Sequence, residues 1–344
     1  MNTVLSNFAL SAPAVSCAPL GGGLVNRSFL VTCADGTRCV LQRVSRAAFP
    51  DPAGLMRNFA AVTRALAAQE PDPRRCLRLI PTRGGRDWYA DGEGEAWRMM
   101  NYVENSVCPE RTDSPADLAA CGEAYGRFLH ALRDFPADTL CEPIPRFHDT
   151  PDRFRLLREA AEADVCRRAG TVREELAFAL ERETEAGRLV RLRDAGALPV
   201  RVTHNDTKCA NVLLDAATRR PLCVVDLDTV MPGLTAWDFG DAIRSGAGRS
   251  GRLELPLCRA FAHGYLSACG ALTEAELRSL PQGVWTMALE CGIRFLTDFI
   301  NGDKYFRITY ETQNLDRARM QLALVRDAER RWDALSGAIL GADG

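Results

Sequence analysis

The chain has 344 residues, which corresponds to about two domains of roughly 150 residues each. Hydrophobic residues make up 47% and charged residues 26%, as in ordinary soluble globular proteins. The 43 basic and 45 acidic residues nearly cancel to a net charge of -2, which argues against a basic surface for nucleic acid or membranes. We therefore expect neither a nucleic-acid partner nor a membrane partner.

The first 26 residues carry no charge, so they lack the basic start of a secretory signal. Pro13 and Pro19 also interrupt them well short of a membrane span. The thirteen cysteines are odd in number, scattered and never spaced as Cys-x-x-Cys. None of the four histidines has zinc-site spacing with a cysteine or another histidine. These features predict a cytoplasmic protein with free thiols.

The first part of the chain is rich in strand patterns. Residues 24–45 predict a β-hairpin, because two strand-like runs surround an Asp-Gly turn. Apolar residues at helical spacing predict an amphipathic helix over 52–69. A second hairpin over 77–90 and a strand over 96–103 follow. Residues 1–103 are therefore expected to form a strand-rich lobe with one prominent helix.

The rest of the chain is mainly helical in pattern. Residues 115–133 and 151–194 are rich in Ala, Leu, Arg and Glu at helical spacing. A compact β segment over 202–229 interrupts them, and helices return over 253–340. The sequence thus predicts a small β-rich lobe followed by a larger helical lobe over 104–344.

Residues 204–211 read His-Asn-Asp-Thr-Lys-Cys-Ala-Asn, and Asp226 follows after a predicted hairpin. A carboxylate at Asp206 can orient an acceptor hydroxyl and take its proton during phosphoryl transfer. Asn211 starts the first hairpin strand and Asp226 ends the second, so both can offer oxygen ligands to one Mg²⁺ on the nucleotide phosphates. Lys208 can place an ammonium near the transferred group.

Three neighbouring residues receive structural or open interpretations. His204 is best explained as a scaffold residue of the loop. Asp228 is either a second metal ligand or a structural carboxylate. Asp238-Phe239-Gly240 spells the metal-binding motif of protein kinases, but it lies too far beyond Asp206 and follows no predicted strand. We expect Asp238 to brace the catalytic loop or to cap the next helix.

The His-x-Asp-x-x-x-x-Asn pattern and the segment 226–244 resemble the aminoglycoside phosphotransferase and choline kinase superfamily. This resemblance covers nearly all of residues 18–325. It implies an α+β, protein-kinase-like bilobal fold with a small antiparallel-sheet N-lobe and a larger, mainly helical C-lobe. More narrowly, five segments resemble N-acetylhexosamine 1-kinases: His204–Lys208, Arg294–Asp298, Asn301–Asp303, Tyr305–Phe306 and Asn314–Arg319.

The resemblance also implies a nucleotide site. Gly22, Gly23 and Asn26 would form a turn over the phosphates, where backbone N–H groups can approach oxygen anions. Arg43 would be the strand cation for the α- and β-phosphates, the alternative being an exposed strand arginine. The 52–69 helix has no acidic residue to pair with this cation, so the partner of Arg43 is unassigned.

Further residues are assigned by the same resemblance. Asn101 and Val103 would belong to the hinge between the lobes, whose backbone would meet the adenine edge. The acceptor site is implied to use residues of the catalytic loop and of the C-terminal helices: Asn205, Asp206, Arg294 and Tyr305.

The hypothesis from the sequence is ATP- and Mg²⁺-dependent phosphorylation of the anomeric hydroxyl of GlcNAc or GalNAc, with Asp206 as the base. The alternative enzyme phosphorylates another small hydroxyl substrate: choline, ethanolamine, homoserine or an aminoglycoside. A quaternary amine would need an aromatic cage and an aminoglycoside an acidic groove. A non-catalytic nucleotide-binding module is a further alternative, against which the intact Asp206, Lys208, Asn211 and Asp226 argue.

Overall fold

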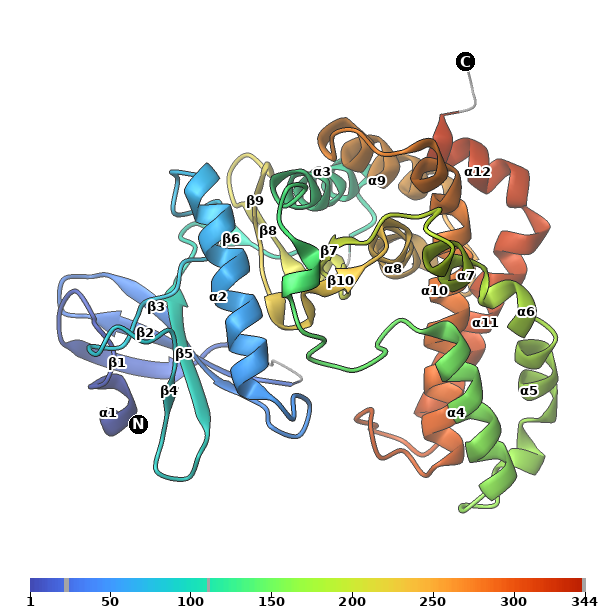
Figure 1. Cartoon of the computed structure of the whole chain (residues 1–344), viewed down its shortest axis with the longest axis horizontal. Helices are drawn as coiled ribbons and strands as arrows, with labels where there is room; N and C mark the ends of the chain where they lie inside the picture. Colours follow the sequence, from blue (N-terminus) through green and yellow to red (C-terminus); the bar gives the residue numbers. More distant parts are fainter. Residues whose placement is uncertain (22–24, 110–111, 342–344) are drawn as a thin grey trace.

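Figure 1 shows the computed structural model of the protein, which describes residues 1–21, 25–109 and 112–341. A small lobe built on a sheet adjoins a larger, mainly helical lobe. The division predicted after residue 103 falls between β5 (Ala96–Asn101) and β6 (Ser106–Val107), and it stays a prediction. In the described part of the chain, no helix is both long and apolar enough to cross a membrane, and no disulfide bond is present.

The small lobe contains one antiparallel sheet with the strand order β1-β2-β3-β5-β4. Its other strands are β1 (Ala14–Pro19), β2 (Arg27–Cys33), β3 (Arg38–Val44) and β4 (Tyr89–Ala90). Its helices are α1 (Asn2–Leu5) and α2 (Pro52–Gln69). The α2 bounds match the predicted helix, because Asp51 accepts a hydrogen bond from the Gly54 N–H at 2.9 Å and Pro52 occupies the first turn.

The second predicted hairpin is only partly formed. Residues 77–82 form only isolated bridges: Leu79 pairs with Met100 of β5, and Thr82 pairs with Phe8, which lies outside the sheet between α1 and β1. Pro81 has no N–H to donate to a ladder, which accounts for the interruption. The turn itself forms, with Gly85 at φ 77°.

The two faces of the sheet bury different side chains. The outer face packs in a small core of its own: Phe8, Val31, Leu41, Trp97 and Met99. The inner face packs against α2 in the main core: Val44, Ala96 and Met100. Gln42 pairs with Arg98 and Arg43 pairs with Trp97 across β3 and β5. Because side chains alternate along a strand, Gln42 and Arg98 lie on the inner face and Arg43 lies on the outer face.

The large lobe is built mainly from helices. These are α3 (Pro115–Ala131), α4 (Thr150–Ala163), α5 (Arg173–Leu180), α6 (Glu183–Ala186), α7 (Arg188–Asp194), α8 (Thr235–Ala247), α9 (Leu255–Ala268), α10 (Glu274–Ile300), α11 (Gln313–Arg330) and α12 (Trp332–Leu340). Short 3-10 turns occur at η1 (Ala137–Thr139), η2 (Ala169–Thr171), η3 (Cys209–Asn211) and η4 (Leu227–Thr229). Its remaining strands are β7 (Arg201–Thr203), β8 (Val212–Asp215), β9 (Pro221–Val224), β10 (Met231–Gly233), β11 (Gly248–Arg249) and β12 (Arg252–Leu253).

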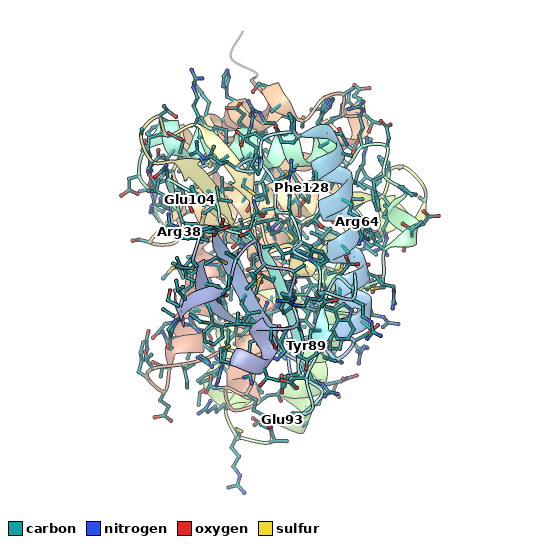
Figure 2. All side chains as sticks on the ribbon, turned by 90° about the vertical axis from the view of Figure 1, so that its left-hand side faces the viewer. Arg38, Arg64, Tyr89, Glu93, Glu104 and Phe128 are labelled. Carbon is teal, nitrogen blue, oxygen red and sulfur yellow. The ribbon has the colours of Figure 1, made fainter. Side chains whose placement is uncertain are left out.

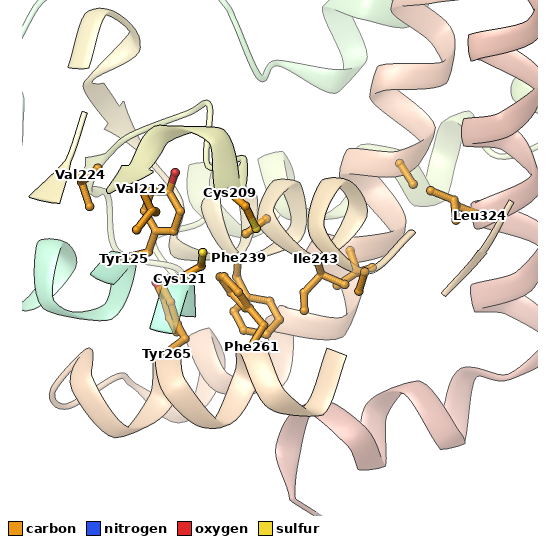
Figure 3. Close-up of a cluster of buried hydrophobic side chains, with 14 of the residues drawn as sticks. Cys121, Tyr125, Cys209, Val212, Val224, Phe239, Ile243, Phe261, Tyr265 and Leu324 are labelled. Atoms are coloured by element: carbon orange, nitrogen blue, oxygen red, sulfur yellow. The ribbon is translucent and has the colours of Figure 1, made fainter. Parts of the chain in front are cut away.

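Two small sheets hold the segment with the catalytic pattern. Strand β7 leads into residues 204–208 and pairs with β10, while the β8–β9 hairpin pairs with β6 just beyond the hinge. The apolar core lies beneath this segment, as Figure 3 shows for Cys121, Tyr125, Cys209 and Phe239. The Tyr125 hydroxyl donates a 2.8 Å hydrogen bond to the Lys208 carbonyl, so the core fixes the loop from below.

Glu276, in the first turn of α10, fastens strand β7 to the helical lobe. It accepts hydrogen bonds from Arg201 Nε and Nη2, each at 2.9 Å, and from Thr235 Oγ1 at 2.9 Å. The Glu276 side chain is 2% exposed. We expect Glu276→Gln to lower the free energy of unfolding near pH 7 by about 3 kcal/mol, because it leaves the Arg201 charge partly buried without its counter-charge. Urea unfolding of both proteins measures this difference.

The difference in the free energy of unfolding between wild type and Glu276→Gln should depend on pH. Burial tends to raise the pKa of Glu276, but Arg201, the Thr273 N–H and Thr235 outweigh burial and lower its pKa below the ordinary value. A lowered native pKa stabilises the fold above the unfolded value, and that gain disappears as pH falls through the native value. The gap between wild type and Glu276→Gln should therefore shrink below about pH 4.3. A gap that stays constant down to lower pH would contradict this role.

Candidate active site

Asp206, Lys208 and Asn211 form one hydrogen-bonded cluster. Lys208 Nζ donates to Asp206 Oδ2 at 2.7 Å, and Asn211 Nδ2 donates to the same oxygen at 3.0 Å. Among the described residues, none donates a hydrogen bond to Asp206 Oδ1. The Asp206 side chain is 34% exposed. One carboxylate oxygen is therefore held in place and the other is available to a ligand.

Lys208 keeps its charge in this cluster. Burial works against a protonated ammonium, but the carboxylates of Asp206 and then Asp226 outweigh burial and raise the pKa of Lys208. The Lys208 ammonium thus stays charged while it is hydrogen-bonded to Asp206 Oδ2.

Asn211 and Asp226 lie at the same end of the β8–β9 hairpin. Val212 pairs with Val224, and the Val225 N–H donates to the Asn211 carbonyl at 2.9 Å. Within the described residues, neither the Asp226 carboxylate nor Asn211 Oδ1 accepts a hydrogen bond. These are free hard oxygens of the kind that Mg²⁺ prefers.

The electrostatics of Asp226 also fit a cation. Partial desolvation and the nearby carboxylates of Asp228 and Asp206 raise the pKa of Asp226 to about 6. A divalent cation would offset that repulsion. In the described chain, no three His, Cys, Asp or Glu side chains form a ready-made metal cluster, so phosphate oxygens would complete the coordination.

His204 is a scaffold residue. Its side chain is fully buried, its Nε2–H donates to the Val225 carbonyl at 2.9 Å, and its Nδ1 accepts the Asp206 N–H at 3.2 Å. These two partners determine the tautomer and join the Asp206 loop to the strand that precedes Asp226. His204 therefore positions both acids without facing a substrate.

Asp238 braces the catalytic loop. Its carboxylate accepts the N–H groups of His204 and Asn205, both at 2.7 Å. Phe239 is fully buried, and a Cβ on Gly240 would lie 2.2 Å from the Gly283 carbonyl oxygen, so α8 and α10 could not pack as closely. Each letter of the Asp-Phe-Gly motif thus has a structural explanation unrelated to metal binding.

Asp228 lies between the two lobes. It is 3% exposed, and its carboxylate accepts hydrogen bonds from Arg98 on one oxygen and from Asn26 on the other. Asn26 Oδ1 in turn accepts the Ser45 N–H at 2.9 Å. The structure therefore places Asn26 on the Asp228 carboxylate and Asp228 in an ion pair between the lobes.

The other residues assigned to the nucleotide lie as follows. Gly22 and Gly23 are outside the described residues. The Arg43 side chain is on the outer face of the sheet, where its Nε lies 3.8 Å from Glu95 Oε2, so the structure does not bring it to the cluster of Asp206, Lys208 and Asn211. Arg98 is the inner-face cation that sequence reasoning missed; a charged residue inside the apolar run 96–100 was the available signal.

Asn101 and Val103 lie at the junction of the lobes. The Asn101 side chain accepts the Arg78 N–H at 2.7 Å and donates to the Pro73 carbonyl at 2.6 Å. Val103 is buried, and its N–H donates to none of the described residues. Figure 2 shows Arg38 and Glu104 side by side at this junction, where they form an ion pair. The backbone N–H of Val103 is thus available to a ligand.

A cavity of about 440 Å³ lies between α4 and α10. The Arg294 guanidinium lies over the rings of Phe147, at 4.7 Å, and Phe306, at 5.7 Å. Arg153 donates to the Phe147 carbonyl at 2.7 Å. The structure thus places two residues assigned to the acceptor by resemblance, Arg294 and Tyr305, in one cavity.

Buried hydrogen bonds connect this cavity to the catalytic loop. His148, next to the cavity residue Phe147, contacts Glu290 Oε1 through Nδ1 at 2.7 Å and the Asn205 carbonyl through Nε2 at 3.2 Å. Glu290 lies one turn before Arg294 on α10. Burial would raise the pKa of Glu290, but His148, Arg294 and Arg153 outweigh burial and lower its pKa.

Asn205 is not directed at the cavity. Its side chain is 3% exposed and donates to the carbonyls of Thr203, at 3.2 Å, and Thr229, at 3.0 Å. Its backbone has φ 63°, which turns the chain sharply just before Asp206. The structure therefore gives the Asn205 side chain a role in loop shape.

Residues 16–275 match the model of a family described as "Phosphotransferase enzyme family". The structure is similar to an aminoglycoside phosphotransferase from Alicyclobacillus acidocaldarius, with 17% identity, 100% of this chain and 96% of that chain covered, and a TM-score of 0.67. It is also similar to the microcompartment-associated aminopropanol kinase, with 19% identity, 97% of each chain covered and a TM-score of 0.67. A third similar structure is amicoumacin kinase in complex with AMP-PNP, Ca²⁺ and Ami, with 12% identity, 93% of this chain and 91% of that chain covered, and a TM-score of 0.61. These likenesses confirm the predicted kinase-like bilobal fold.

Proposed function

Since the chain belongs to the phosphotransferase enzyme family, we propose that it uses ATP and Mg²⁺ to phosphorylate the anomeric hydroxyl of an N-acetylhexosamine, GlcNAc or GalNAc. Family membership establishes the coarser activity: the protein is a small-molecule phosphotransferase of the superfamily that acts on small hydroxyl substrates. The choice of sugar rests on the cavity between α4 and α10, which contains Arg294 and Tyr305.

The charge of the cavity is the observation that carries this choice. Arg153 and Arg294 line it together with the carboxylates of Glu159 and Asp298, and burial together with the Arg294 charge lowers the pKa of Arg153. Both acids are already engaged within the protein: Arg155 donates to Glu159, and the N–H groups of residues 304, 305 and 306 donate to Asp298. Two guanidiniums repel the cationic groups of choline, ethanolamine and aminoglycosides. The rings of Phe147 and Phe306 are already covered by Arg294, so they do not form an open cage for a quaternary amine.

A neutral amino sugar suits the same surface. Arg294 and the Tyr305 hydroxyl can donate hydrogen bonds to the acetamido carbonyl and ring hydroxyls, and the apolar wall can pack against the C–H face of a pyranose. A volume of about 440 Å³ is typical of small-ligand sites. His148, which follows the cavity residue Phe147, lies 3.2 Å through Nε2 from the carbonyl of Asn205, the residue before Asp206, and this link supports an acceptor site in the cavity.

Asp206 is the base in this proposal. Lys208 and Asn211 hold Oδ2, so Oδ1 can accept the hydrogen bond of the sugar hydroxyl and take its proton as the phosphoryl group transfers. The Lys208 ammonium stabilises negative charge on the transferred group. Both groups are already positioned, which reduces the entropic cost of reaching the reactive geometry.

Asn211 Oδ1 and the Asp226 carboxylate would hold Mg²⁺, which neutralises charge on the nucleotide phosphates when bound. The backbone of Asn101 and Val103 would contact the adenine, and Gly22 and Gly23 would lie over the phosphates. The outward direction of Arg43 leaves a different residue to supply positive charge on the inner face of the sheet.

An acceptor panel tests the proposal. ADP release should occur with GlcNAc or GalNAc and stay at background with choline, ethanolamine, homoserine and aminoglycosides. The methyl glycoside of GlcNAc is the matched control, because its anomeric oxygen carries no proton, and it should not be phosphorylated. Turnover of one of the other acceptors with none on hexosamines would favour the alternative enzyme.

A further inference from the structure

Arg98 carries a positive charge into an apolar part of the small lobe. Its side chain is 1% exposed; its guanidinium lies 4.0 Å over the Phe59 ring, and its Nη1 lies 4.0 Å from Met56 Sδ. A charge in such surroundings needs a counter-charge and hydrogen-bond partners. Gln42, its partner in the sheet register, accepts from both Nε, at 2.9 Å, and Nη2, at 2.7 Å.

The counter-charge of Arg98 comes from the other lobe. Helix α2, which packs beside Arg98, has no acidic residue. The partner is Asp228, whose second oxygen accepts a hydrogen bond from Asn26. Both oxygens of this C-lobe carboxylate are therefore held by side chains of the N-lobe.

This contact is made directly beside a proposed metal ligand. Asp226 has φ 61° and ψ 53°, a left-handed conformation that is uncommon for residues other than glycine, although Asp adopts it more often than most. On one side, Val225 is bonded to Asn211 and His204. On the other side, Asp228 is bound by the N-lobe.

A second contact from the N-lobe reaches the same loop. Asn58, a buried residue of α2, donates through Nδ2 to the Val230 carbonyl at 3.0 Å. The segment that follows Asp226 is therefore attached to the N-lobe at two points, Asp228 and Val230. Its conformation depends on how the N-lobe packs against it.

We propose that Arg98 is a positioning residue: through Asp228 it holds the loop that presents Asp226 to the nucleotide-bound metal. This inference rests on the proposed nucleotide and metal chemistry, but not on the identity of the acceptor. It explains why no acidic residue is needed on α2, because the acid that neutralises the inner-face cation is supplied by the metal loop itself. Metal affinity then depends on contacts made by the opposite lobe.

The test is Mn²⁺ binding to the ADP-saturated protein. Electron paramagnetic resonance measures binding as the loss of the signal of free Mn²⁺. Arg98→Lys keeps the charge near Asp228 but loses the planar guanidinium, whose Nε and Nη2 both donate hydrogen bonds to Gln42. We expect it to weaken Mn²⁺ binding by about 10-fold, the lower end of the range for partners of metal ligands, because Arg98 acts on Asp226 only through Asp228 and the loop. Arg64→Lys is the matched control, because Arg64 pairs with Asp87 at the surface of the same lobe (Figure 2) and should leave Mn²⁺ affinity unchanged.

A second variant covers the case in which Arg98→Lys does not fold. Gln42→Met leaves the Arg98–Asp228 charges in place and removes the two hydrogen bonds from Arg98 together with the one that Gln42 Nε2 donates to Ser28 Oγ. It should therefore weaken Mn²⁺ binding in the same direction by a smaller factor. Thermal melting without ligand reports folding of each variant. Mn²⁺ affinity within about two-fold of wild type in a folded variant would overturn the inference. Tighter binding would also overturn it, because Asp228 would then act as a ligand released from Arg98. Failure of the wild type to bind Mn²⁺ would instead contradict the proposed function.

Discussion

Asp206→Asn should lower kcat by about 10²- to 10⁴-fold, the range in which general-base catalysis contributes. The amide keeps an oxygen that Lys208 and Asn211 can approach, so the loop should retain its shape, but it cannot take the proton of the acceptor hydroxyl. Steady-state kinetics with the best acceptor of the panel measures the loss. Calorimetric titration with ADP should show nucleotide affinity close to that of wild type.

The control for this variant is Asp35→Asn. Asp35 lies in the exposed turn of the β2–β3 hairpin, where it accepts the Thr37 N–H at 2.9 Å, far in sequence from the catalytic loop. The Asp35→Asn variant removes the same charge from the protein without changing the cluster around Asp206. Asp35→Asn should turn over at the rate of the wild type. If Asp206→Asn did the same, the role of Asp206 as the base would be refuted.

Asp226→Asn should remove activity by a different route. The variant keeps the shape of the side chain but loses the charge that attracts a divalent cation, so kcat should fall by at least about 100-fold, as when a charge-stabilising group is lost. Its distinguishing feature is metal binding: Mn²⁺ affinity of the ADP complex should fall steeply in Asp226→Asn and stay near wild type in Asp206→Asn.

The two variants therefore separate the base from the metal ligand. If Asp226→Asn bound Mn²⁺ as tightly as the wild type, the assignment of Asp226 would be wrong. Raised Mg²⁺ concentration should recover part of the activity of Asp226→Asn and none of that of Asp206→Asn, because only the first defect is one of metal affinity.

Some parts of the fold could be predicted because the deciding interactions are local. The bounds of α2 follow from apolar spacing, a proline in the first turn and the Asp51 cap. The β2–β3 hairpin follows from its Asp-Gly turn. The second predicted hairpin formed only partly, because Pro81 interrupts a strand whose remaining partners, Met100 and Phe8, lie in other parts of the chain.

The candidate site divides in the same way. Asp206, Lys208, Asn211 and Asp226 lie within one short stretch that contains a single hairpin, so their spacing in the sequence is enough to bring them together. Arg43 was assigned by its place along a strand, but a strand directs successive side chains to opposite faces, and only the packing of both faces decides which one meets the other lobe.

Short spacing along the chain was enough to predict that Asp206, Lys208 and Asn211 lie together, and the resemblance carried by the same motifs predicted the bilobal fold and the family. The folded chain alone shows that Arg98 faces inward, that Asp228 neutralises it and that Arg294 shares a cavity with Arg153. Those contacts join residues more than a hundred positions apart, and their geometry follows from strand register and helix packing, which spacing along the chain does not encode.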